Sequence, residues 1–143
     1  MNNKEFPANS IRICFDDIKA VEGSISGVCM ETSVDFRGKR DLIVKIDQAF
    51  DAIGQPQPHQ VIRSFQKQEK NYKSYIGDPA RYHTSDDIRQ KKGEALTVDM
   101  IMTSRHHTEW QGFIVDEKGE ELAKFESSLD FFDWLVTLVG RRP

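Results

Sequence analysis

The chain has 143 residues, 38% of them hydrophobic and 30% charged, and it carries a formal net charge of -3. That length is enough for one ordinary domain over residues 1–143, with a core that needs neither disulfides nor metal. The composition excludes a membrane protein and a disordered tail, and the acidic balance argues against nucleic acid as the main partner.

The start of the sequence contains no apolar segment of the kind found in secretory signals, since residues 1–10 are mostly polar. No stretch approaches the roughly 18 consecutive apolar residues that a membrane span requires. We therefore expect a cytoplasmic protein that does not contact a membrane.

The first half of the chain predicts three strands and a helix. Apolar and polar residues alternate in the first strand, and the helix has its apolar residues on one face. Gly27 lies in the middle of the second strand, and Gly54 ends the helix. The expected elements are strands at 10–16, 24–31 and 33–36 and a helix at about 39–53.

The second half predicts the same order of elements. Gly112 lies in the middle of the second strand, Ser127 or Ser128 caps the helix, and Gly140 ends it. An aromatic residue, Phe36 or Phe125, ends the strand before each helix. The expected elements are strands at 95–103, 108–116 and 120–125 and a helix that ends at about 139.

We interpret the two halves, residues 10–54 and 94–140, as strand–strand–strand–helix units related by internal duplication. The alternative is that any two such units look alike, because amphipathic helices share their spacings. The predicted fold class is α+β, with an antiparallel sheet and both helices packed on one side. With Gly54 placed on Gly140, the helices align without gaps, and the matched apolar pairs are Ile43–Leu129, Ile46–Phe132, Phe50–Val136 and Ile53–Val139.

A basic, tyrosine-rich connector, residues 55–93, joins the two units. It carries eight Lys or Arg residues against four Asp or Glu residues, and short helices are expected at 61–72 and from Ser85. Basic groups could follow phosphates while rings stack on bases, or the same groups could hold the connector against an acidic body. The candidate ligand or nucleic-acid contacts are Arg63, Lys70, Tyr72, Lys73, Tyr75, Arg81 and Tyr82.

The last helix carries more apolar surface than one core-facing side needs. We predict that the inward stripe consists of Leu129, Phe132, Leu135, Val136 and Val139. Phe131, Trp134 and Leu138 form a second stripe at i, i+3 and i+7. We expect this second stripe to pack against another copy of the chain, with burial beneath the connector as the alternative.

Several segments resemble those of a group of small uncharacterised bacterial proteins. The group has no assigned activity, so the resemblance implies a bacterial cytosolic origin and no catalytic or binding residues. The segments that carry it are residues 11–17, 54–58, 63–65, 109–113 and 125–129.

No constellation of residues indicates catalysis or metal binding. His106 and His107 are adjacent, and neighbouring residues on a strand point to opposite faces. Cys14 and Cys29 lie in apolar runs typical of buried free thiols. Asp16 and Asp17 are interpreted as turn acids. We expect no cofactor, and an enzyme is the least favoured class.

The favoured function is therefore a non-catalytic interaction or regulatory module that forms a homodimer. The alternative is binding of a small anionic ligand or single-stranded nucleic acid through residues 63–92.

Overall fold

A computed structural model describes residues 6–54, 80–106 and 109–141. The fold is α+β, and the described strands form one six-stranded antiparallel sheet in the order β3-β2-β1-β4-β5-β6. The strands are β1 (Ser10–Asp17), β2 (Glu22–Ser26), β3 (Val34–Arg37), β4 (Leu96–His106), β5 (Glu109–Val115) and β6 (Glu121–Phe125). The helices within these ranges are α1 (Lys39–Ile53), α4 (Ser85–Arg89) and α5 (Ser128–Arg141).

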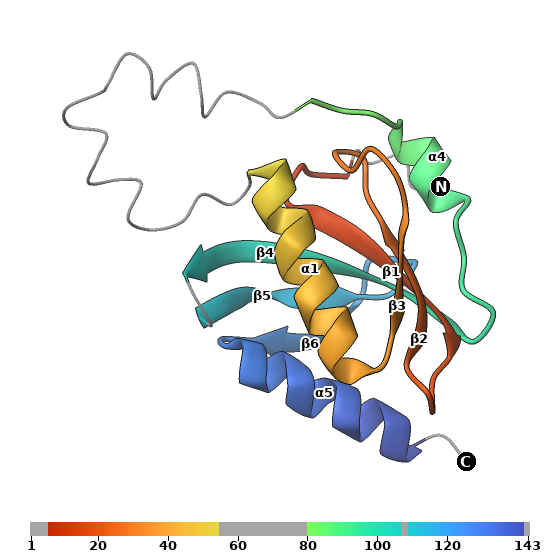
Figure 1. Cartoon of the computed structure of the whole chain (residues 1–143), viewed down its shortest axis with the longest axis vertical. Coiled ribbons are helices and arrows are strands. Elements are labelled where there is room, and N and C mark those ends of the chain that lie inside the picture. Colours follow the sequence, from red (N-terminus) through yellow and green to blue (C-terminus); the bar gives the residue numbers. More distant parts are fainter. Residues whose placement is uncertain (1–5, 55–79, 107–108, 142–143) are drawn as a thin grey trace.

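The sheet consists of two three-stranded meanders joined at its centre (Figure 1). Strands β1, β2 and β3 follow one another outward on one side, and β4, β5 and β6 do so on the other. The meanders meet where β1 pairs with β4 in antiparallel register, with Arg12 opposite Asp99 and Ile13 opposite Val98. The strand order outward from the centre is therefore the same in both halves of the chain.

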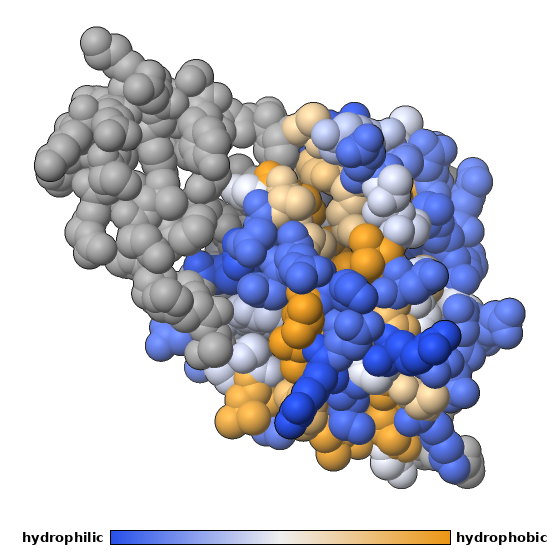
Figure 2. Space-filling view, in the orientation of Figure 1, coloured by the Kyte–Doolittle hydropathy of each residue, from blue (hydrophilic) through white to orange (hydrophobic). Residues whose placement is uncertain are grey.

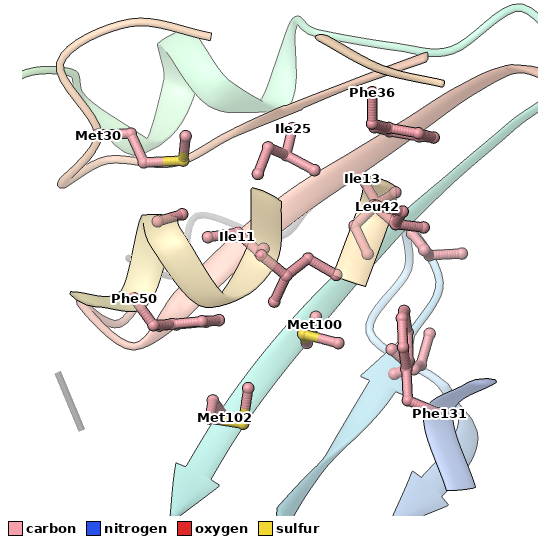
Figure 3. Close-up of a cluster of buried hydrophobic side chains, with 14 of the residues drawn as sticks. Ile11, Ile13, Ile25, Met30, Phe36, Leu42, Phe50, Met100, Met102 and Phe131 are labelled. Carbon is pink, nitrogen blue, oxygen red and sulfur yellow. The ribbon is translucent and has the colours of Figure 1, made fainter. Parts of the chain in front are cut away.

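Strand β1 is buried on both faces, because residues 10–15 are all shielded from solvent. Its alternation sends Ile11, Ile13 and Phe15 into the hydrophobic core, while Arg12 and Cys14 lie on the opposite face. Figure 3 shows side chains from strands and helices converging on this core. The buried helix residues that contribute to it are Leu42, Ile46, Ala49, Phe50, Ile53, Phe131 and Leu135.

Helices α1 and α5 contact each other, whereas α4 lies apart from them (Figure 1). Gly54 ends α1 in the left-handed conformation, with φ 79°, as expected. Ser127 caps α5 by accepting a hydrogen bond from the Asp130 backbone N–H at 3.0 Å, also as expected, but α5 continues through Gly140 to Arg141. None of the helices in the described ranges combines the length and apolar content needed to cross a membrane.

The predicted helix start at Ser85 is confirmed, because α4 begins there after a capping box. The Thr84 hydroxyl accepts the backbone N–H of Asp87, and the Asp87 carboxylate accepts that of Thr84. The other expected connector helix, at 61–72, lies outside the described residues.

The predicted second strand was placed too late in the sequence. Strand β2 ends at Ser26, and Gly27 belongs to a turn in which its carbonyl accepts the N–H of Met30. The mid-strand glycine is Gly23, whose position leaves no room for a side chain: a Cβ atom would lie 1.8 Å from the Cys14 carbonyl oxygen. The apolar residues after Gly27 are buried although they are not in a strand, and an apolar run of this kind also fits the pattern of a buried strand.

The predicted inward stripe of α5 is only partly right, because Leu135 is buried and Val139 packs against the core but two other members do not. Leu129 and Val136 are exposed, whereas Phe131 is completely buried and Trp134 and Leu138 pack against the core. The Phe131 ring lies 5.9 Å from that of Phe125 and 5.8 Å from that of Trp134, centroid to centroid. Both stripes are apolar, but the aromatic one buries the larger area and therefore faces the sheet.

We predict that Gly23→Ala lowers the free energy of unfolding by about 3 kcal/mol, because the new methyl group meets backbone rather than a flexible side chain. Gly140→Ala is the matched control, since an added Cβ there contacts nothing and alanine favours the helix. Urea unfolding of both variants measures the difference. Equal stabilities for Gly23→Ala and the wild type would contradict the described packing.

Candidate functional site

A buried ion pair lies on the sheet face opposite the main core, at the junction of β1 and β4. The Arg12 Nε donates to Asp99 Oδ1 at 2.9 Å, and Nη2 donates to Oδ2 at 3.1 Å. Only 3% of Arg12 and 6% of Asp99 is exposed. Buried charges of this kind are tolerated when they are paired and hydrogen-bonded, and this bidentate arrangement meets both conditions.

The same arginine holds the C-terminal end of α4 against the sheet. Its Nη1 donates to the carbonyl oxygens of Ile88, Arg89 and Lys91 at 3.3, 3.0 and 3.2 Å. These carbonyls lie at a helix end, where the macrodipole favours a cation. Burial alone would lower the pKa of Arg12, but the hydrogen bond and charge of Asp99 outweigh burial and raise this pKa above its ordinary value.

Phe6 connects the N-terminal segment to this cluster. The guanidinium carbons of Arg12 and Arg89 lie 5.4 and 5.0 Å from the centre of its ring, within the range of cation–π contacts. The Phe6 backbone N–H also donates to the Ser85 hydroxyl at 2.9 Å. One aromatic ring thus contacts the first strand's arginine and the α4 segment together.

Beside this cluster the structure contains a cleft of about 390 Å³. Ser10, Arg12, Arg89 and Asp99 contribute polar groups to its lining. Its apolar lining comes from Phe6, Ile101, Phe113 and Val115, and the β5–β6 turn, residues 116–119, borders it. A cavity of this size that combines apolar walls with placed polar groups is suited to a small molecule.

The acids that line the cleft are engaged in structural contacts. Asp116 accepts the backbone N–H groups of Lys118 and Glu120, which shapes the turn. Glu117 forms an ion pair with Lys92. Lys118 itself has no side-chain partner among the described residues. Within those residues, no group of three His, Cys, Asp or Glu side chains is placed to hold a metal ion.

A second buried arginine joins the two halves on the helical side. Arg105 is 8% exposed and binds Asp47 of α1 at 3.0 Å and Asp51 at 2.7 Å. A register shift in β4 between Met102 and Ser104 places Arg105 opposite the core residue Trp110. The second half of the sheet is therefore fastened to the helix of the first half.

Of the candidate connector residues, the structure describes Arg81 and Tyr82. Arg63, Lys70, Tyr72, Lys73 and Tyr75 lie outside the described residues. Arg81 is exposed, and its Nη1 donates to the Phe6 carbonyl at 3.1 Å. Tyr82 is 52% exposed, and its backbone N–H donates to the Val28 carbonyl at 2.7 Å.

The stripe predicted as a dimer interface, Phe131, Trp134 and Leu138, faces the sheet of its own chain. Phe131 is completely buried, and Trp134 and Leu138 are half-buried where they pack against the core. The apolar residues that α5 leaves exposed are Leu129 and Val136, which sequence analysis had assigned to the core.

Sequence analysis missed Arg12 and Asp99. Both occupy polar positions of alternating strands, where an exposed face is the default expectation. A weak signal was present, because each strand lies at the start of its unit, and the first strands of two joined meanders meet at the centre of the sheet. Central strands are covered on both faces more often than edge strands are.

Both cysteines are buried free thiols, as expected, and they lie on opposite sides of β1. Cys29 belongs to the main core, whereas Cys14 lies on the same face as Arg12. Burial raises the pKa of the Cys14 thiol from 9.0 to about 11. Asp16 and Asp17 act as turn acids, accepting the backbone N–H groups of Glu94 and Ala20.

We predict that Arg12→Lys loosens α4 while the sheet remains formed. Lysine keeps the charge but lacks the planar fork that reaches Asp99 and three carbonyls at once. Amide hydrogen exchange of Gln90 and Lys91 should accelerate about tenfold or more relative to Met100. Arg37→Lys is the control, since the Arg37 side chain is 86% exposed. Unchanged protection in α4 would contradict the assigned role of Arg12.

A second prediction concerns pH. The raised pKa of Cys14 means that folding favours the neutral thiol, so this contribution is complete below about pH 9 and is lost as the pH rises through about 11. Wild-type stability should therefore fall by about 2 kcal/mol more than that of Cys14→Ala across this range. Parallel urea titrations at several pH values measure the difference. Parallel pH profiles would show that Cys14 ionises equally well in the folded and unfolded chains.

A scan against models of protein families and searches of curated proteins and of solved structures found no match to this chain. The resemblance to a group of small bacterial proteins therefore stays a prediction. The function has to be argued from the surfaces and charges of the chain itself.

Proposed function

We propose that this protein is a non-catalytic interaction module that forms a homodimer through its helical layer. The observation that carries the proposal is apolar surface left on the two contacting helices. Leu129 and Val136 of α5 are 65% and 46% exposed, and Val44 of α1 is 48% exposed. We call these three residues the helix patch.

The helix patch is spread along one side of α5 and continues onto α1. Leu129 and Val136 are seven residues apart, so they lie on the same helix face, and the partly buried Phe132 lies between them. Figure 2 shows orange, hydrophobic patches at the lower edge of the view, where α5 lies, and another near the centre, with blue, hydrophilic surface between them. Apolar surface concentrated in this way is typical of a protein–protein contact.

A second copy of the chain is the occupant that the surrounding charges favour. A two-fold interface must be complementary to itself, so its rim needs both signs of charge. Exposed acids, Asp130 and Asp133, accompany the apolar residues of α5, and the exposed Arg40 lies in the first turn of α1. Two copies related by a two-fold axis can place Asp130 and Asp133 of one copy near Arg40 of the other.

The state of the cleft supports a binding role over catalysis. Asp99 is bound to Arg12 and Glu117 to Lys92, while Asp116 bonds the backbone of its own turn. A general base needs a carboxylate or imidazole within reach of a substrate proton. Each of these three acids instead serves the fold.

We further infer that the scaffold arose by internal duplication, with both helices packed on one side of the sheet. One offset holds from the glycines of β2 and β5 onward and supports this inference, since the matched residues there lie 89 positions apart (112 minus 23, for example). This pairing replaces the one based on Gly54 and Gly140, which matched buried with exposed residues. The pairs are Gly23–Gly112, Phe36–Phe125, Leu42–Phe131 and Ile46–Leu135, and their members have matching burial in all but the glycines.

The glycine pair adds an independent similarity. Gly23 lies opposite Phe15, and Gly112 lies opposite Met102. A Cβ on either glycine would meet the carbonyl oxygen of the residue before that partner, at 1.8 or 2.0 Å. The register then shifts directly after each partner residue, in β1 and in β4. Two unrelated meanders would not be expected to share a close approach and a bulge at the same place.

Binding of a small anionic ligand or single-stranded nucleic acid through residues 63–92 stays an alternative proposal. Its described contributors, Arg81 and Tyr82, are exposed, and the remainder lie outside the described residues. The contacts of Arg81 and Arg89 with Phe6 fit the other interpretation of the connector, in which basic groups fasten it to the body of the protein.

We predict that the wild-type protein has a mass in solution twice the 16.5 kDa of one chain. Replacing Leu129 and Val136 together by Glu should halve that mass and leave the fold intact, because both side chains are exposed in the single chain. Light scattering coupled to gel filtration, with circular dichroism as the test of folding, measures both properties.

The matched control is Leu122→Glu, since Leu122 is 47% exposed but lies on β6 rather than on α1 or α5. It should leave the mass unchanged. A monomeric wild type, or a double variant that remains dimeric, would remove the helix patch as the interface.

A further inference from the structure

We propose that the cleft beside the Arg12–Asp99 pair binds a neutral small molecule with an aromatic body and a polar edge that both donates and accepts hydrogen bonds, as a primary amide does. The site lies on the sheet face opposite the main core and is independent of the helix patch.

Within the polar lining of the cleft, the Arg12–Asp99 pair supplies one donor and two acceptors. A guanidinium has five N–H groups, and those of Arg12 bond Asp99 through Nε and Nη2 and three carbonyls through Nη1. One Nη2 proton is left without an acceptor among the described residues. Each Asp99 oxygen accepts a single bond in that part of the chain, so each can accept another.

These unused groups match an amide edge. An amide carbonyl can accept the remaining Arg12 proton while an amide N–H donates to Asp99. Arg12 and Asp99 are more than nine-tenths buried, and both line the cleft, so hydrogen bonds made there are shielded from water.

Charge balance favours a neutral ligand over an ion. The Arg12 and Asp99 charges cancel, and Arg89 and Glu117 are matched by Asp86 and Lys92. Asp116 and Lys118 carry opposite charges on the same turn. The charges of these groups sum to zero, so an ionic ligand would lose its hydration without meeting a net opposite charge, which is unfavourable in a site with apolar walls.

The walls favour an aromatic body. Phe6 and Phe113 contribute rings, and Ile101 and Val115 contribute branched aliphatic surface. Rings in such a setting pack edge-to-face or offset against an aromatic guest. The volume of about 390 Å³ accommodates a bicyclic molecule.

The test compares indole-3-acetamide with indole-3-acetate, which share a ring system and differ in charge. Titration of the full chain, followed by amide and methyl NMR, should show saturable shifts confined to Ile101, Phe113, Val115 and the turn at residues 116–119. We expect the dissociation constant of the anion to be at least about tenfold higher than that of the amide.

A filled cleft supplies the second arm. Ile101→Trp places a large side chain in the cleft and should weaken amide binding at least about tenfold. Thr103→Trp is the matched control, on the same strand but outside the cleft lining. If Ile101→Trp fails to fold, the comparison of amide and anion binding to the wild type still tests the proposal. Equal or tighter binding of the anion, shifts elsewhere, or no saturable amide binding at millimolar concentration would overturn the proposal.

Discussion

The buried pair of Arg12 and Asp99 is the interaction on which the arrangement of the rest depends. It lies where the two meanders meet, so it joins the halves of the sheet. Through its remaining donors Arg12 also fixes α4, and its guanidinium contacts Phe6. Buried ion pairs add little net stability, because desolvation offsets their attraction. Their stronger effect here is on register, because a one-residue slip of β1 would carry Arg12 into the apolar core.

The pair also occupies a special place in the proposed duplication. Arg12 and Asp99 lie 87 positions apart (99 minus 12), as do Phe15 and Met102, the partners of the two mid-strand glycines. Under this proposal Arg12 and Asp99 are equivalent positions, and they face each other across the centre. In a dimer of identical units, such positions would hold two like charges. A chain that contains both units permits opposite charges there, so the proposed duplication is compatible with a buried ion pair at this junction.

Sequence patterns predicted the element order, the antiparallel sheet and the limits of α1, because the alternation in β1 and the apolar face of α1 are strong local signals. The sequence patterns failed where two orientations of an element fit the local sequence equally well. Helix α5 has two apolar stripes, and only the rings of Phe125 and Trp110 across the sheet decide that Phe131 faces inward. The cleft could not be predicted from the sequence. The alternation in β1 predicts an exposed Arg12 and carries no information about the packing of α4 over this arginine.

A double-mutant cycle on Arg12 and Asp99 tests the central claim most directly. Arg12→Met and Asp99→Leu should each lower the free energy of unfolding by about 3–5 kcal/mol, because each strands a buried charge. The double variant should lose clearly less than the sum, with a coupling free energy of about 2 kcal/mol or more from urea unfolding. Losses that add to within about 0.5 kcal/mol would show that the two residues act independently, and the pair could not then be what joins the two halves.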